Sequence, residues 1–256
     1  MPEQKQLPVA LSARWLGLLV VASLCIQACL TETPAARGLA AHSRAASNRS
    51  PADSAAQQAD AQTAQQRTER LVNEIREAAY PELRGADVQV QLFKSESDYF
   101  RARFALPQFL TGRKMRYLIF ANPDVFTREA PAAGVRAILA HELAHVLYYS
   151  QRNRLELLGL VRLAGKGFTA SFERWADLQA IKRGYGAGLK AYRQWLYRHI
   201  PARSLGEKQR DYFSPEEIDA ILSATQARPE LLAYWLKHVP RNLKEILAAQ
   251  GRTAKR

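Results

Sequence analysis

The middle of the chain reads, from Val135 to Tyr149, VRAILAHELAHVLYY. Apolar residues recur in this stretch at the three- and four-residue spacing of an α-helix, and Pro131 stands just ahead of it, where prolines often begin helices. The segment from His141 to His145 adds two imidazoles and a carboxylate to the same turn. We therefore predict a central helix over 135–149 that carries polar side chains among apolar ones.

The spacing of the two histidines predicts a metal site. His141 and His145 differ by only about 40° around a helix, so both imidazoles can reach one ion. Glu142 points about 100° away from His141, beside such an ion rather than onto it. A carboxylate in that place can take the proton of a water that Zn²⁺ has acidified. The pattern predicts a catalytic zinc site with Glu142 as general base; the alternative is a surface helix with incidental histidines.

A catalytic zinc needs a third protein ligand and an open fourth position. Glycine at 148 and histidine at 151 would indicate a metzincin, but the chain has Tyr148 and Gln151. Farther on, Glu173 and Asp177 stand four residues apart on one face of a predicted helix. We expect Glu173 to complete a His₂Glu set and Asp177 to accept the outer N–H of a ligand imidazole, that of His141. The alternative for this pair is an ordinary charged helical face.

The composition is that of a globular protein with a basic balance. Of the 256 residues, 47% are hydrophobic and 24% are charged, and 37 Lys and Arg exceed 24 Asp and Glu. These values exclude a wholly disordered, fibrous or multi-span membrane protein. Cys25 and Cys29 are the only cysteines, so no disulfide framework, cysteine-ligated zinc or thiol nucleophile is expected after residue 30. Any metal there must be held by histidine and carboxylate.

The N-terminus has the pattern of an export signal. Lys5 and Arg14 precede an apolar run from Trp15 to Leu30. The run is shorter than the roughly 20 residues that span a bilayer as a helix. We therefore expect residues 1–28 to be a signal peptide.

The end of this run resembles a bacterial lipobox. It reads Ile26-Gln27-Ala28-Cys29, with an aliphatic residue three before the cysteine and a small one just before it, although glutamine is atypical there. We expect Cys29 to become the lipidated first residue of the mature chain. The alternative is ordinary cleavage in the alanine-rich stretch after Pro34, with Cys29 incidental.

A segment of low complexity follows the signal. Residues 31–66 contain Leu39 as their one large apolar residue and no aromatic residue, so they cannot bury enough surface to order themselves. We expect a flexible tether over 29–66, although its end, 57–66, can run into the next helix. Of the net charge of +13, residues 1–30 carry one unit and 31–66 none, so +12 belongs to 67–256. We expect residues 67–256 to form the zinc domain, with a helical C-terminal part.

Two strands are expected ahead of the central helix. Alternating apolar and polar residues predict one over 86–93, and β-forming residues predict another over 116–121. We expect the second to be an edge strand that pairs with an extended peptide; the alternative is a central strand buried on both faces. Helices are predicted over 67–80, 169–183, 187–199, 214–225 and 229–248, the fourth with a capping box at Ser214. The fold class is therefore α+β, mostly helical, with a small sheet beside the central helix.

The motifs together resemble those of a gluzincin. His-Glu-x-x-His, followed on a later helix by Glu-x-x-Ala-Asp, is similar to the zinc metallopeptidases of the HtpX, Oma and CAAX-prenyl-protease type. The matching residues are His141, Glu142, His145, Glu173, Ala176 and Asp177, and the resemblance extends from about residue 68 to 200. It implies a zincin-like endopeptidase domain with a strand beside the active-site helix that binds substrate backbone. The sequence shows no transmembrane helices, so it is more similar to the compact lipoprotein members than to the integral-membrane ones.

These features predict one zinc per chain and an endopeptidase that acts on envelope or membrane-proximal proteins. The protein is expected on the periplasmic side of a bacterial envelope, held at a membrane surface by its lipid. The oxyanion needs a donor, for which His199, Tyr212, His238 and the arginines are candidates. The alternative function is a catalytically idle zincin-fold lipoprotein that binds partners or acts like a chaperone. Nucleic acid is not an expected partner, because no reader motif is present.

Overall fold

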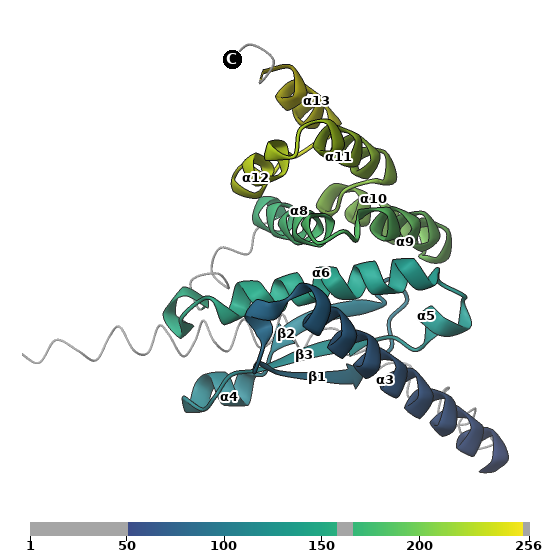
Figure 1. Ribbon diagram of the computed structural model, residues 1–256. Helices are drawn as coiled ribbons and strands as arrows, with labels where there is room; N and C mark the ends of the chain where they lie inside the picture. The colour runs from purple at the N-terminus through teal and green to yellow at the C-terminus, as the bar shows by residue number, and fades with distance from the viewer. Residues whose placement is uncertain (1–50, 158–165, 253–256) are drawn as a thin grey trace, which may run out of the picture. The chain divides into compact units, whose positions relative to one another are not determined.

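The computed structural model describes residues 51–157 and 166–252 (Figure 1). Ala55 and the residues after it belong to one compact unit. The expected export signal, Cys29 and the first part of the tether lie outside the described residues. The described part is mostly helical and contains one small sheet, which confirms the α+β class. None of its helices is both long enough and apolar enough to cross a membrane.

The sheet has three strands in the order β1-β3-β2. Strands β1 (Asp87–Leu92) and β3 (Arg116–Ala121) are parallel, with Val88 opposite Tyr117, and lie close to the two expected ranges. Strand β2 (Phe100–Phe104) runs antiparallel on the other side of β3, with Ala102 opposite Ile119. The sequence reasoning missed β2, although its alternation of Phe, Arg and Ala has the period of two that a strand shows.

The edge-strand role expected for 116–121 is wrong, because β3 is the central strand and is paired on both sides. Its alternating buried residues Tyr117, Ile119 and Ala121 face the core, and Leu118 and Phe120 between them are half-buried. Both faces of β3 are therefore covered at least in part, which is the alternative that its apolar sequence left open. The edge positions of the sheet belong to β1 and β2.

The central helix α6 (Ala132–Ser150) lies between the sheet and the C-terminal helices (Figure 1). It begins three residues before the predicted range of 135–149 and ends one residue after it. From Gly134 to Leu147 nearly every residue is buried, because the sheet covers one side while α8 (Lys166–Lys182) and α9 (Gly186–His199) cover another. A helix buried on all sides cannot keep its polar groups in water, so those on α6 need protein partners or a ligand.

Glycines allow α9 to approach α6 closely. A Cβ atom at Gly188 would lie 2.4 Å from the carbonyl oxygen of Ala133, and one at Gly134 would lie 3.2 Å from the backbone of Tyr192. A larger residue at Gly188 would collide with backbone, which cannot move as a side chain can. The crossing carries Tyr192 and Arg193 to the side of α6 that bears Glu142.

The remaining helices differ in part from the expectations. Helix α3 begins at Pro51 rather than near 67, so residues 51–66 of the expected tether are helical; Ala and Gln favour helix, and Ala64 is buried. The helix expected over 229–248 is two helices interrupted near Pro240. Helix α10 was not expected. The elements are α3 (Pro51–Ala79), η1 (Pro81–Leu83), α4 (Leu106–Thr111), α5 (Asp124–Thr127), α10 (Ala202–Asp211), α11 (Pro215–Ala227), α12 (Glu230–Lys237) and α13 (Leu243–Arg252).

The predicted capping box of α11 is present. The hydroxyl of Ser214 accepts a hydrogen bond from the backbone N–H of Glu217, whose carboxylate accepts one from the backbone N–H of Ser214. Glu217 also accepts a hydrogen bond of 3.0 Å from buried Arg174 on α8. The start of α11 is thereby fixed against the residue that follows Glu173.

Candidate metal centre

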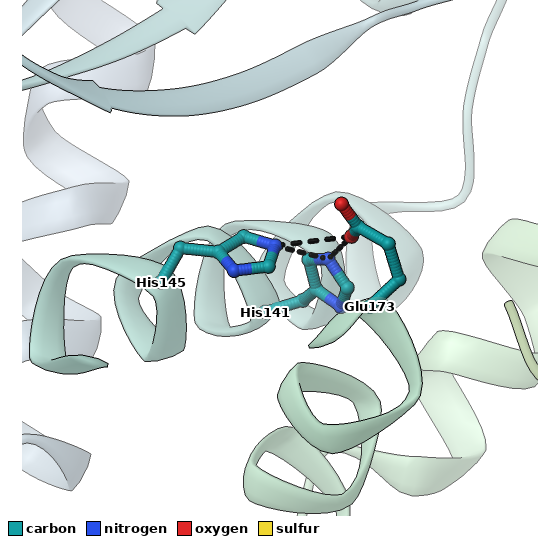
Figure 2. A group of neighbouring side chains, drawn as sticks. All are labelled: His141, His145 and Glu173. Carbon is teal, nitrogen blue, oxygen red and sulfur yellow. Dashed lines mark hydrogen bonds and ion pairs between the residues drawn. The ribbon is translucent and has the colours of Figure 1, made fainter. Parts of the chain in front are cut away.

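Two helices bring a histidine pair and a carboxylate together (Figure 2). His141 and His145 lie one turn apart on α6, and Glu173 reaches them from α8. The two Nε2 atoms are 3.1 Å apart. The Oε2 atom of Glu173 lies 3.1 Å from Nε2 of His141 and 3.0 Å from Nε2 of His145. Figure 2 shows both rings and the carboxylate converging on one point.

These three side chains could hold a metal ion. Ligand bonds of about 2.0–2.1 Å at tetrahedral angles would separate the ligand atoms by about 3.3 Å, close to the three distances in the cluster. Both histidines are buried and Glu173 is half-buried, so an ion would be shielded from solvent. Two imidazoles and one carboxylate are donors that several divalent metals accept. The residues present therefore fit a metal ion with one ligand position left open.

Asp177 fixes the orientation of His141. The Nδ1–H of His141 donates to Oδ1 of Asp177 over 2.7 Å, which leaves Nε2 facing the cluster. The same carboxylate accepts hydrogen bonds from the guanidinium of Arg193 over 2.9 Å and from the backbone N–H of Phe213 over 3.1 Å. Asp177 is fully buried, so these donors replace the water that its charge would otherwise need. The contact between Asp177 and His141 is the one expected from the sequence.

Sequence reasoning missed Arg193. Its side chain is 2% exposed, pairs with Asp177 and lies 4.3 Å from the ring centre of Tyr212. A signal was present, because Arg193 shares the apolar face of α9 with Leu189 and Leu196 at helical spacing. An arginine on an apolar face needs a buried carboxylate, and Asp177 is the one that it meets.

The charges in the cluster favour a cation. Burial would raise the pKa of Asp177, but Arg193 and His141 lower it. Burial likewise opposes ionisation of Glu173, yet its two histidine neighbours hold its pKa well below the usual value. The pKa of His141 rises to about 10, since Asp177 and Glu173 outweigh the effect of its burial. Two ionised carboxylates thus lie at or beside the point where the ligand atoms converge.

Glu142 is buried next to the cluster, on the same helix. Its Oε2 atom has no hydrogen-bond partner among the described residues, and burial raises its pKa. A void of about 20 Å³ adjoins it, lined also by Tyr192, Arg193 and Tyr212. A space of that size holds about one water molecule. A buried carboxylate with a free acceptor atom and a raised pKa is typical of a group that exchanges protons.

The structure brings one of the three named oxyanion candidates to this site. The ring of Tyr212 lies 5.8 Å from that of His141 and lines the void beside Glu142. Burial raises the pKa of Tyr212 well above its usual value, so its hydroxyl keeps its proton. His199 and His238 instead donate from Nδ1 to the carbonyl oxygens of Trp195 and Tyr234 on their own helices. In the described part of the chain neither pairs with a member of the cluster.

Aromatic side chains pack beside His145. The ring of Phe172 lies 4.5 Å from that of His145 and 4.7 Å from that of Tyr148. Phe168 stacks on Phe172 at 5.9 Å. Phe172, Tyr148 and Phe168 are only half-buried, so apolar surface is available beside the candidate metal ligands.

Comparison with known proteins identifies no relative. No family model matches the chain, and neither a curated protein nor a solved structure matches it. The function must therefore be inferred from the arrangement of the described side chains and from the sequence motifs that they carry.

Proposed function

We propose that this chain is a zinc-dependent endopeptidase of the gluzincin type, similar to the HtpX, Oma and CAAX-prenyl-protease type. The observation that carries the proposal is the convergence of His141, His145 and Glu173 beside buried Glu142, whose Oε2 atom has no hydrogen-bond partner among the described residues. Structural zinc sites are closed by four protein ligands, whereas catalytic sites use three and keep one position for water or substrate. The group found among the described residues has three.

Zinc is the metal that the donor set favours. Two imidazoles and a glutamate with an open position form the His₂Glu set of catalytic zinc sites. The only cysteines, Cys25 and Cys29, precede the described residues and leave a histidine and carboxylate site as the place for the metal. When bound, zinc would polarise a peptide carbonyl and acidify a water molecule. We propose one zinc per chain.

The side chains around the cluster have separate roles in the proposed hydrolysis. Oε2 of Glu142, which accepts no hydrogen bond from the described residues, takes the proton of the attacking water and passes it to the leaving amine. The protonated hydroxyl of Tyr212 donates to the oxygen of the scissile carbonyl as negative charge develops on it. Arg193 has a positioning role. Its guanidinium donates a hydrogen bond to Asp177 and lies over the ring of Tyr212.

Substrate backbone is proposed to bind along β2, in the role that the sequence reasoning gave to β3. One edge of β2 pairs with β3, and the other pairs with no strand of the described ranges. Phe104 at the end of β2 packs against Tyr149 on α6 with ring centres 5.5 Å apart, so the strand lies alongside the helix that carries the histidines. An extended peptide added to this edge would gain main-chain hydrogen bonds with little demand on its side chains.

The proposed location is the bacterial envelope, on the periplasmic side. The support is the sequence: an export pattern over residues 1–28 and a lipobox-like end at Cys29. With lipid on Cys29, the enzyme would act on envelope or membrane-proximal proteins. Mass spectrometry of the mature N-terminus tests this directly. An acylated Cys29 is expected, and an unmodified N-terminus farther along the chain would show a secreted enzyme without an anchor.

Replacement of Glu142 by glutamine tests the proposed chemistry. The amide is nearly isosteric but cannot take up a proton, so zinc content should be unchanged while casein hydrolysis falls by roughly 10²- to 10⁴-fold. The matched control is Glu77→Gln, because Glu77 is an exposed residue of α3 and its replacement should leave turnover unchanged. Activity of Glu142→Gln within about threefold of the unmodified protein would remove Glu142 from the mechanism. Zinc-loaded protein that turns over casein no faster than Glu142→Gln would favour the idle binding function.

A further inference from the structure

Three leucines are exposed on two segments of the chain that hydrogen bonds connect. Leu106 and Leu110 lie one turn apart on α4, with 46% and 69% of their surface exposed, and Leu155 in the segment after α6 is 80% exposed. Arg154 joins the two segments, because its guanidinium donates hydrogen bonds to the carbonyl oxygens of Gln108 and Arg113. The other large hydrophobic residues exposed in the described ranges, Tyr234 and Leu247, belong to α12 and α13.

The orientation of α4 explains why its leucines are exposed. Phe109 points inward, where its ring packs 5.1 Å from that of Phe104 at the end of β2. Leu110 lies about 100° around the helix from Phe109. Leu106 and Leu110 are both exposed, and the helix ends at Gly112 in a left-handed conformation. Phe109 thus anchors the helix, and none of the described residues buries Leu106 or Leu110.

Cations surround these leucines. Residues 99–123 contain five Arg and Lys and no Asp or Glu. Arg101 and Arg116 pair with Asp98 and Asp87, which leaves Arg103, Arg113 and Lys114 without a carboxylate partner among the described residues. We call Leu106, Leu110, Leu155, Arg113 and Lys114 the leucine-cation surface.

We propose that the leucine-cation surface binds the surface of a bilayer that contains anionic lipids. Aliphatic side chains enter the boundary between headgroups and acyl chains, while Arg and Lys remain with the phosphates. Interfaces with proteins draw their affinity from buried Trp, Tyr and Arg that fill pockets. The apolar members of this surface are all leucine, which suits a fluid partner without fixed pockets.

The surface is connected to the candidate metal centre through packed rings. Phe109 packs on Phe104, the Phe104 ring lies 5.5 Å from that of Tyr149, and Tyr149 stacks on His145 at 6.5 Å. Binding through α4 would therefore hold the His145 end of the centre near the lipid. The membrane contact does not depend on peptidase activity; only the resulting preference for substrates at the bilayer surface rests on the proposed function.

A tryptophan placed on the surface tests the contact in the full chain. Leu110→Trp is mixed with vesicles of phosphatidylglycerol and phosphatidylcholine with brominated acyl chains, which quench only fluorophores that enter the bilayer. Leu247→Trp is the matched control, since Leu247 is half exposed on α13. The N-terminal apolar run is the same in both proteins, so insertion of that run cannot cause a difference. After subtraction of the unmodified protein's signal, quenching is expected for Leu110→Trp alone. Equal quenching of the two variants, or none, would overturn the proposal.

The electrostatic part is tested in the Leu110→Trp protein by Arg113→Glu and Lys114→Glu. Each reversal removes a cation and adds an anion, so it should weaken the apparent affinity for the anionic vesicles by at least about fivefold. The same reversals at Lys237 and Arg241, which are exposed on or just after α12, should have little effect. Undiminished quenching with vesicles of phosphatidylcholine alone would contradict the role of the cations. Protection of the tryptophan from acrylamide by poly-glutamate but not by vesicles would assign the surface to an acidic protein instead.

Discussion

The histidines of α6 and those at the ends of α9 and α12 differ in what their rings meet. His199 and His238 each donate to the carbonyl four residues earlier and stack on the aromatic residue there, with ring centres 4.6 Å apart in both cases. His141 and His145 instead face a carboxylate that arrives from α8. His199 and His238 thus bond within their own helices, and among the described residues neither belongs to a group that could hold a metal ion. The second helix, rather than the histidine itself, makes the α6 pair a candidate metal centre.

Removal of the α6 pair gives the largest expected effect. The double variant His141→Ala, His145→Ala takes away two of three ligands, and the chain has no thiol after Cys29 to replace them. Zinc content, measured by atomic absorption on purified protein, should fall from about one per chain to background.

The matched variant His199→Ala, His238→Ala removes the same number of imidazoles from the helix ends and should keep the metal. Stoichiometric zinc in both double variants would show that the metal binds elsewhere. Loss of zinc from both would mean that the two groups of histidines are not functionally distinct, and the comparison would fail.

The part of the site that is local in sequence could be predicted. His141, Glu142 and His145 share one helix, and Glu173 and Asp177 share another, so the 3.6-residue period fixes which side chains are neighbours. The hydrophobic periodicity also indicated α6, and the Ser-x-x-Glu spacing indicated the capping box at Ser214. The meeting of the two helices was expected from the motifs rather than from the helical period, and the structure shows it.

What the sequence did not reveal depends on packing partners. The β-forming residues of 116–121 indicate a strand, but they do not show how many strands pair with it, so the central position was only the alternative to an edge strand. Arg193 was overlooked because arginine on a helix is normally exposed, and its burial is explained only by Asp177 on another element. The hydrogen bonds of His199 and His238 to carbonyls of their own helices depend on the side-chain rotamer, which sequence spacing does not determine.

Arg193 extends the comparison to the partners of the α6 histidines. It donates a hydrogen bond to Asp177, which in turn accepts one from His141. Arg193→Met should lower the free energy of unfolding by about 3–5 kcal/mol, since it leaves the buried charge of Asp177 short of its partner. Arg198→Met, on the exposed side of the same helix beside His199, should change it by less than about 0.5 kcal/mol. Urea unfolding with a chelator present measures both without a contribution from metal. Similar small losses in the two variants would show that the buried pair is not needed to hold this region.

Replacement of Asp177 has the smallest expected effect. It tests whether Asp177 supports zinc binding by His141 or only the stability of the fold. Asp177→Asn keeps an oxygen near Nδ1 of His141 but removes the negative charge, so zinc affinity should fall by roughly 10- to 100-fold in competition with a chromophoric chelator. The same change leaves Arg193 without a carboxylate and should lower stability. In Asp177→Asn, Arg193→Met both buried charges are gone, so part of the lost stability should return while the affinity for zinc stays low. Recovery of zinc affinity together with stability would mean that Asp177 supports only the fold. In that case His141 would hold its orientation without the carboxylate, and the α6 histidines would differ from those of α9 and α12 by Glu173 alone.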